Sequence, residues 1–182
     1  MKNPTRITVA FDDKTLGLFN KARNETGLSQ SELLRQALRF YCENRNTLGS
    51  STSRKLSYYL DMLPQGEHVI LDVDHWLLFL GLIESSPEKD AFWEDCQRIA
   101  KSHAEQLMHK IHSINDLLER LEACNFFRVT KNSEKDFTLV LGSEVSKKFV
   151  KTFLKEFCSA GGFKIEIKED LAKMRIVVSG SA

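Results

Sequence analysis

Eight His, Cys and Asp side chains are candidates for binding a divalent metal, and their spacing decides whether they could act together. Cys96 and His103 would share one face of a helix, but seven residues separate them by about 10 Å along its axis, too far to hold one ion. His109 and His112 could share an ion only if both are helical. The other candidates are His68, Asp72, Asp74 and His75. We interpret all eight as polar residues of loops and helix ends and expect no metal, with metal sensing left open as the alternative.

The sequence contains no arrangement typical of a catalytic site. It has no G-x-S-x-G, no H-E-x-x-H and no glycine-rich phosphate loop, and the glycines of "SAGG" are better placed to end a helix. An aromatic run could line a ligand pocket, although core packing is the preferred interpretation. Its members are Trp76, Phe79, Phe92 and Trp93. We therefore expect no enzymatic activity and no cofactor.

A second group of chemically useful side chains stands near the N-terminus, in "TRITVAFDD", residues 5–13. The alternation predicts a short strand with two different faces. One face would carry Ile7, Val9 and Phe11, and the other Arg6, Thr8 and Ala10. No second strand is predicted for the next fifty or so residues, so this strand has no local partner for its backbone hydrogen bonds.

Two helices are predicted to follow the strand. Asp12 or Asp13 can cap the first, which shows helical apolar spacing as far as Gly27. Ser29 and Glu32 stand in the relation of a capping box, and the second helix continues to about residue 44. Its apolar positions are Leu34, Ala37, Leu38 and Tyr41.

Charge is distributed unevenly along the chain. The formal net charge is +1, but residues 1–55 carry +5 and the remainder −4. A basic head joined to an acidic body is the distribution expected of a polyanion-binding region, and chance surface composition is the alternative.

The order strand, helix, turn, helix, with "RITVAFDD" leading and "GLSQSELLRQALRFY" closing, resembles the ribbon-helix-helix family of DNA-binding proteins, which includes Arc, MetJ, CopG and NikR. The resemblance covers about residues 4–44. It implies an intertwined homodimer in which the strand pairs antiparallel with the same strand of a second copy, and the two-stranded ribbon enters the DNA major groove.

The resemblance also implies roles for individual residues. Arg6, Thr8 and Ala10 would face the bases, with Arg6 carrying most of the discrimination because it alone can contact guanine in a bidentate manner. The N-terminus of the second helix, at Ser29, Gln30 and Ser31, would clamp a phosphate. The dimer core would contain Ile7, Val9, Phe11, Leu34 and Leu38. Further phosphate contacts could come from Lys2, Lys14, Lys21, Arg23 and Arg35.

A larger body is predicted after a flexible polar linker at residues 45–55. Helices are expected at 56–63, at 86–111 with a cap at Ser86, and at 113–124 with a cap near Ser113. A buried strand is expected at 68–74 and a buried helix at 75–85. Two strand hairpins, 125–143 and 163–180, flank a helix at 143–162. This β-β-α-β-β order predicts an α+β fold for residues 56–182, with helices on one face of a four-stranded antiparallel sheet.

Together these features predict a homodimeric, sequence-specific transcriptional regulator of a prokaryote that binds double-stranded operator DNA, with the body sensing a signal or joining dimers into a tetramer. The alternative is an antitoxin whose C-terminal part binds a partner protein. No apolar run is long enough to span a membrane, and the N-terminus lacks the apolar core of a signal peptide, so we expect a cytoplasmic protein.

Overall fold

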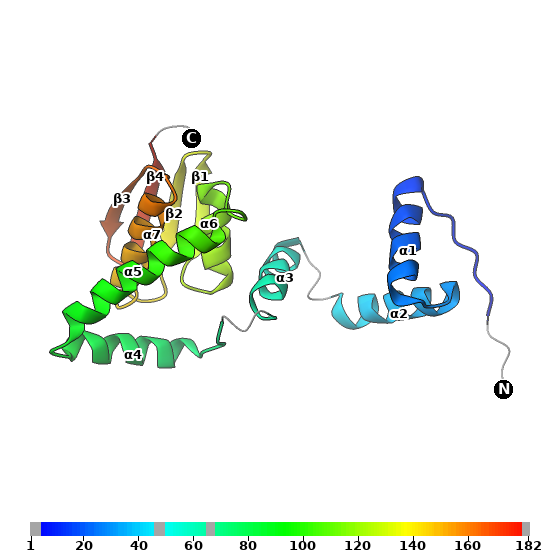
Figure 1. Cartoon of the computed structure of the whole chain (residues 1–182), viewed down its shortest axis with the longest axis horizontal. Coiled ribbons are helices and arrows are strands. Elements are labelled where there is room, and N and C mark those ends of the chain that lie inside the picture. Colours follow the sequence, from blue (N-terminus) through cyan, green and yellow to red (C-terminus); the bar gives the residue numbers. More distant parts are fainter. Residues whose placement is uncertain (1–4, 46–49, 65–67, 180–182) are drawn as a thin grey trace. The chain divides into compact units, whose positions relative to one another are not determined.

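The computed structural model describes residues 5–45, 50–64 and 68–179. The chain divides into two compact units, Met1–Ser53 and Arg54–Ala182, which we call unit 1 and unit 2. Each is described by itself (Figure 1).

Unit 1 consists of an N-terminal segment and two helices. Helix α1 spans Asp13–Thr26 and helix α2 spans Gln30–Asn44. Residues 5–12 form neither helix nor strand. The strand predicted at 5–13 is therefore not formed within one chain, because a strand requires a hydrogen-bonded neighbour and this chain supplies none among its described residues.

The two helices of unit 1 begin where short-range hydrogen bonding allows. The Asp12 carboxylate accepts a hydrogen bond from the backbone N–H of Thr15 at 2.7 Å, and Gly27 ends α1 with φ of 68°. The Ser29 hydroxyl accepts from the backbone N–H of Glu32 at 3.3 Å and begins α2. Both predicted helices and their caps are confirmed.

The next two helices differ from the prediction, and the first of them begins at the end of unit 1 and continues into unit 2. Helix α3 spans Ser50–Met62, so residues 50–55 of the predicted linker are helical, whereas residues 46–49 lie outside the described residues. Helix α4 spans Val73–Ser85. The strand predicted at 68–74 is wrong, because residues 68–72 form no regular element and Asp72 caps α4 by accepting a hydrogen bond from the N–H of Asp74.

The next two predicted helices are formed, but the first of them differs from the predicted range 86–111 at both ends and ends earlier, at Leu107. Helix α5 spans Lys89–Leu107 and begins three residues later than expected, since the Ser86 hydroxyl accepts from the N–H of Glu88 in a turn rather than capping the helix. Helix α6 spans Ile114–Ala123. It is capped as predicted by Ser113, which accepts from the N–H of Asp116 at 3.1 Å.

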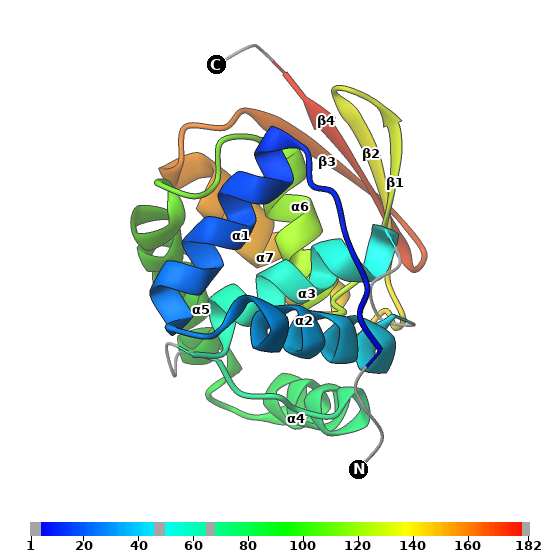
Figure 2. The same ribbon diagram turned by 90° about the vertical axis from the view of Figure 1, so that its right-hand side faces the viewer.

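The last third of the chain forms the predicted β-β-α-β-β arrangement. Its elements are β1 (Arg128–Ser133), β2 (Asp136–Val140), α7 (Lys147–Ala160), β3 (Ile165–Asp170) and β4 (Lys173–Val178). The strands make one antiparallel sheet in the order β1-β2-β4-β3. Helices α6 and α7 lie against one face of this sheet (Figure 2).

The core of unit 2 lies between these helices and the sheet. Alternate residues of the central strands point into it, and Phe137 pairs with Ile176 while Leu139 pairs with Met174 across β2 and β4. Leu118 of α6 is completely buried against the same cluster. Unit 2 thus has a hydrophobic core of its own. No helix in the described part of the chain is both long and apolar enough for a membrane span.

Candidate nucleic-acid interface

The three predicted base-contacting residues are all exposed. Arg6, Thr8 and Ala10 lie in the segment before α1 with both sides of that segment accessible. Ile7 and Val9, predicted for the dimer core, retain 80% and 56% of their accessible surface. The structure therefore places the predicted reading residues in solvent, but one chain alone does not bury the residues behind them.

The apolar side chains of the two helices of unit 1 are likewise not buried in one chain. Neither α1 nor α2 contains a buried residue. Leu34 and Leu38, the predicted core residues of α2, are exposed, and only Phe11 is half-buried through a tilted contact with Phe19 at 5.3 Å between ring centroids. A polypeptide this short rarely buries enough apolar surface to be stable by itself. Unit 1 is thus incomplete as an isolated chain.

The N-terminus of α2 has the geometry expected of an anion clamp. Ser29, Gln30 and Ser31 are all exposed, and the backbone N–H groups of the first helical turn point outward along the axis. One of them, that of Glu32, is already satisfied by Ser29. The positive end of the helix dipole remains accessible.

Several charges near this surface are already paired. The Arg35 guanidinium donates to the Glu32 carboxylate at 2.6 Å, and this hydrogen bond holds the pKa of Glu32 below its usual value. Lys21 lies 3.9 Å from Glu25. Binding a phosphate through Arg35 or Lys21 would first require these pairs to separate, although such exposed pairs are weak.

The metal-binding candidates of unit 2 are scattered. Throughout residues 5–45, 50–64 and 68–179, no three His, Cys, Asp or Glu side chains come close enough to hold an ion. Asp72 and His75 form an exposed pair at 3.7 Å. The four cysteines are free, and burial raises the pKa of the Cys158 thiol to about 12, which leaves it unreactive.

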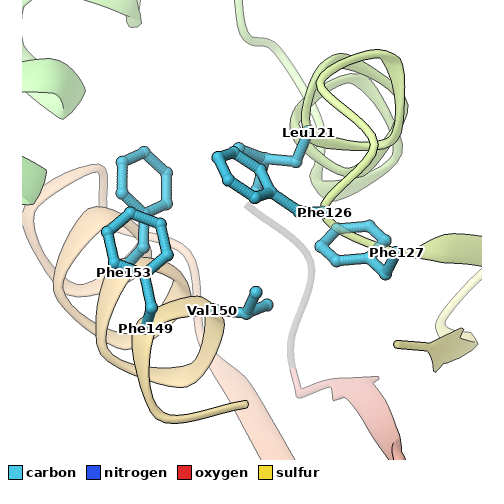
Figure 3. A pocket seen from close by; sticks show the side chains of 6 residues that line it. All are labelled: Leu121, Phe126, Phe127, Phe149, Val150 and Phe153. Carbon is cyan, nitrogen blue, oxygen red and sulfur yellow. The ribbon is translucent and has the colours of Figure 1, made fainter. Parts of the chain in front are cut away.

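The aromatic residues of unit 2 fill space between its helices. Figure 3 shows a small apolar gap with essentially no room for a water molecule. It is lined by Leu121, Phe126, Phe127, Phe149, Val150 and Phe153. Trp76 packs edge-on against Phe149 at 4.7 Å, and Trp93 is buried, as the core interpretation predicts. Phe79 is exposed, which that interpretation did not anticipate.

A second, open hollow of about 250 Å³ lies between α3 and α6. Its charged groups satisfy one another, because the Asp61 carboxylate accepts from Lys110 at 2.6 Å and from Arg120 at 2.8 Å. The hydrogen bond from Lys110, followed by that from Arg120, holds the pKa of Asp61 below its usual value. This cluster joins α3 to the rest of unit 2.

Geometry and sequence together define a ribbon-helix-helix region followed by a helical region with a four-stranded antiparallel sheet. Residues 5–45 match the family model described as "Ribbon-helix-helix protein, copG family". The predicted family resemblance of the N-terminal region is thereby confirmed. Proteins of this family bind DNA and form dimers. At the level of the family, the match indicates a DNA-binding transcription regulator or an antitoxin. No curated protein and no solved structure matches the chain.

One surface was missed by the sequence analysis. The segment 68–85 was expected to be buried, yet Leu80 is its only buried residue in the described structure. The signal available in the sequence was the apolar character of "HWLLFLGLIES" on all sides of the helix, which requires cover from more than one direction.

Proposed function

We propose that this protein is a homodimeric, sequence-specific transcriptional regulator that reads the DNA major groove with a ribbon made from two copies of residues 5–11. The observation that carries the proposal is the unpaired, alternating segment with Ile7 and Val9 exposed on one side. Pairing with a second copy satisfies the backbone N–H and C=O groups of this segment. It also buries Ile7 and Val9 against Leu34 and Leu38 of α2.

The opposite side of the ribbon then carries the reading chemistry. Arg6 can donate two hydrogen bonds to O6 and N7 of one guanine, Thr8 can bond a base or contact a thymine methyl, and Ala10 offers apolar contact only. Arg6 therefore contributes most of the sequence discrimination. The first turn of α2, at Ser29, Gln30 and Ser31, binds a backbone phosphate and sets the position of the ribbon along the duplex.

Unit 2 acts in this proposal as a regulatory or oligomerisation module without enzymatic activity or a metal. The antitoxin alternative is less well supported, because an antitoxin segment that folds on its partner has no need of the separate core that unit 2 possesses. A protein that binds the chromosome of a prokaryote works in the cytoplasm.

The test is fluorescence anisotropy of the full chain with its own upstream DNA and with a scrambled duplex, at 50 and 200 mM salt. We expect specific binding that falls by about 10³-fold or more between the two salt concentrations, as phosphate contacts release counterions. Arg6→Ala should reduce the preference for the specific duplex by roughly 10- to 100-fold, from the loss of about 1–3 kcal/mol of discrimination.

Arg98→Ala is the matched control, because Arg98 is an exposed arginine of α5 that pairs with its neighbour Asp95. It should leave both affinities unchanged. Equal affinity of the wild-type chain for the two duplexes, or an Arg6→Ala variant with unaltered preference, would overturn the proposal.

A further inference from the structure

Strand β3 forms one edge of the sheet, and its outer side has no hydrogen-bonded neighbour among the described residues. It pairs with β4 alone and lies at the margin of the sheet (Figure 1). Ser179 donates its backbone N–H to the Lys164 carbonyl at 2.9 Å, which shows which residues face β4. Because this direction alternates along an antiparallel strand, the backbone N–H and C=O groups of Ile165, Ile167 and Glu169 point away from the sheet. Such an edge can accept another strand.

The opposite edge of the sheet, β1, is less suited to pairing. Its register with β2 shifts between Lys131 and Ser133. The backbone N–H of Val129, on its outer side, donates to the Glu122 carboxylate at 2.9 Å. Irregular strands and covered backbone groups are common protections of an edge against pairing. Strand β3 pairs without a register shift along its whole length, Ile165–Asp170, so it is the more regular edge.

The two faces of β3 differ in chemistry. Ile165 and Ile167 are half-buried and pack against the core beneath the helices. Glu169, on the same face, forms an ion pair with Lys151 of α7. The other face is exposed and entirely charged, and its signs alternate in the order Lys164, Glu166, Lys168 and Asp170.

This alternation of charge is complementary to its own reverse. An antiparallel pair of β3 strands with its two-fold axis at Ile167 places Lys164 opposite Asp170 of the second copy. It also places Glu166 opposite Lys168, so every charge on this face meets the opposite sign, which stabilises a sheet. An axis at Glu166 or at Lys168 would instead place that residue opposite its own copy, and like charges directly opposite are destabilising. The charges therefore favour one register and one partner, a second copy of the same strand.

The backbone allows the same register. With the axis at Ile167, this residue exchanges two hydrogen bonds with its own copy, and Ile165 does so with Glu169 of the second copy. The charged residues then fall between these pairs, where the Cα atoms of an antiparallel ladder come closest, at about 4.5 Å. Glu169 retains Lys151 as the partner of its charge, so no unpaired carboxylate is placed beside Ile165.

We propose that β3 pairs antiparallel with β3 of a second copy, with Ile167 on the two-fold axis, so that the two sheets join into one. This inference rests on the proposed function in one respect, since it names the surface by which unit 2 joins copies of the regulator. The contact combines backbone hydrogen bonds with exposed ion pairs, and salt screens the ion pairs.

Disulfide trapping tests the pairing in the full chain. A background variant carries Cys42→Ser and Cys96→Ser, which removes the exposed thiol and one half-buried thiol. Ile167→Cys is introduced into it and treated with a mild oxidant, because the Cα atoms of a hydrogen-bonded pair lie about 5.5 Å apart, within disulfide range. Val129→Cys is the matched control, since Val129 is also half-buried against the core on an edge strand.

We expect most Ile167→Cys chains to become disulfide-linked dimers, while the control and the background remain single chains. Equal yields for Ile167→Cys and Val129→Cys would overturn the pairing.

Charge variants test the register. Glu166→Lys with Asp170→Lys makes the exposed face of β3 wholly basic, and Lys164→Glu with Lys168→Glu makes it wholly acidic. Either pair, added to Ile167→Cys, should lower the dimer yield by about fivefold or more, because like charges then stand opposite. When the basic and acidic variants are unfolded in urea and refolded as a mixture, mass spectrometry should find linked dimers with one chain of each. Yields that ignore these charges, or a mixture without mixed dimers, would overturn the proposal.

Amide hydrogen exchange measures the same contact in the unmodified chain. In the pair, the outward amides of Ile165, Ile167 and Glu169 are hydrogen-bonded, so they should exchange as slowly as those of Glu166 and Lys168, which face β4. Fast exchange of the outward amides would overturn the pairing, even if the Ile167→Cys variant failed to fold.

DNA binding measured on the same samples separates this inference from the proposed function. Disulfide formation at Ile167→Cys without preference for any duplex overturns the proposed function and leaves the pairing supported. A preference for specific DNA combined with a control-level disulfide yield overturns the pairing alone.

Discussion

At the scale of single residues, the Arg120 guanidinium is a buried cation of unit 2 that requires a carboxylate partner. Its residue keeps only 7% of its accessible surface, and its charge is met by the Asp61 carboxylate at 2.8 Å. A buried cation without a partner is costly, so this pair fixes the position of α3 on α6. Tyr59 adds a hydrogen bond from its hydroxyl to the Ala123 carbonyl at 2.8 Å.

Replacing the acid should expose that dependence. We expect Asp61→Ala to lower the free energy of unfolding by about 1–3 kcal/mol, because Arg120 is left buried without its carboxylate. Urea denaturation followed by circular dichroism measures the change. Asp95→Ala breaks the exposed pair with Arg98 and should change the same quantity by less than about 0.5 kcal/mol. Equal effects of the two variants would show that Arg120 does not depend on Asp61.

The same pair predicts a pH dependence. The hydrogen bond from Lys110, then that from Arg120, lowers the pKa of Asp61 in the folded state, while in the unfolded chain the carboxyl titrates near its ordinary value of about 4. Its stabilising contribution is therefore complete above about pH 4 and is lost as the pH falls through the lower folded pKa. The difference in unfolding free energy between wild type and Asp61→Asn should shrink over this acidic range, and a constant difference would contradict the assignment.

At the scale of the elements, helix α1 contains one glycine and ends at another, and these two glycines have different backbone conformations. Gly27 ends α1 with φ of 68°, a conformation that side chains disfavour, while Gly17 lies within the helix. A Cβ atom at either position would meet nothing within 4 Å, so backbone conformation alone separates them.

Gly27→Ala should therefore destabilise the helix by about 1 kcal/mol, whereas Gly17→Ala should stabilise it by about 0.5–1 kcal/mol. Thermal melting followed by circular dichroism compares the two. Each variant serves as the control for the other, since both add one methyl group to α1. Changes of the same sign would mean that the helix does not end at Gly27 in solution.

At the scale of the whole molecule, the two units differ in how they obtain a core. Unit 2 buries a large cluster between α6, α7 and the sheet, including Phe137, Phe157 and Leu118. Unit 1 buries no residue of its helices in one chain. The stability of unit 1 must therefore come from association with another chain, whereas unit 2 is stabilised by a core within its own chain.

This difference should be visible as a concentration dependence. A tenfold rise in protein concentration favours the associated state by about 1.4 kcal/mol, so the calorimetric transition of unit 1 should move to higher temperature. Leu38→Asp should abolish the unit 1 transition, because it places a charge in the predicted dimer core. It should leave the unit 2 transition in place, because Leu38 lies in α2 of unit 1. A unit 1 transition that does not respond to concentration would indicate a core within a single chain.

The sequence by itself determined the features that depend on neighbours along the chain. The caps at Asp12, Ser29 and Ser113 and the stop at Gly27 follow from hydrogen bonds over two to four residues, and they were predicted correctly. The two hairpins and the family resemblance of the N-terminal region are equally local patterns. The phosphate clamp at Ser29 and the reading role of Arg6 remain predictions that follow from that resemblance.

Only the tertiary structure decided what depends on distant partners. The order β1-β2-β4-β3 and the contact of Asp61 with Arg120 join residues far apart in sequence, and no periodicity encodes them. The segment 68–85 shows the physical reason most clearly. Its apolar residues signal that water must be excluded, but whether the covering surface is the same chain or another is set by the packing of the whole molecule.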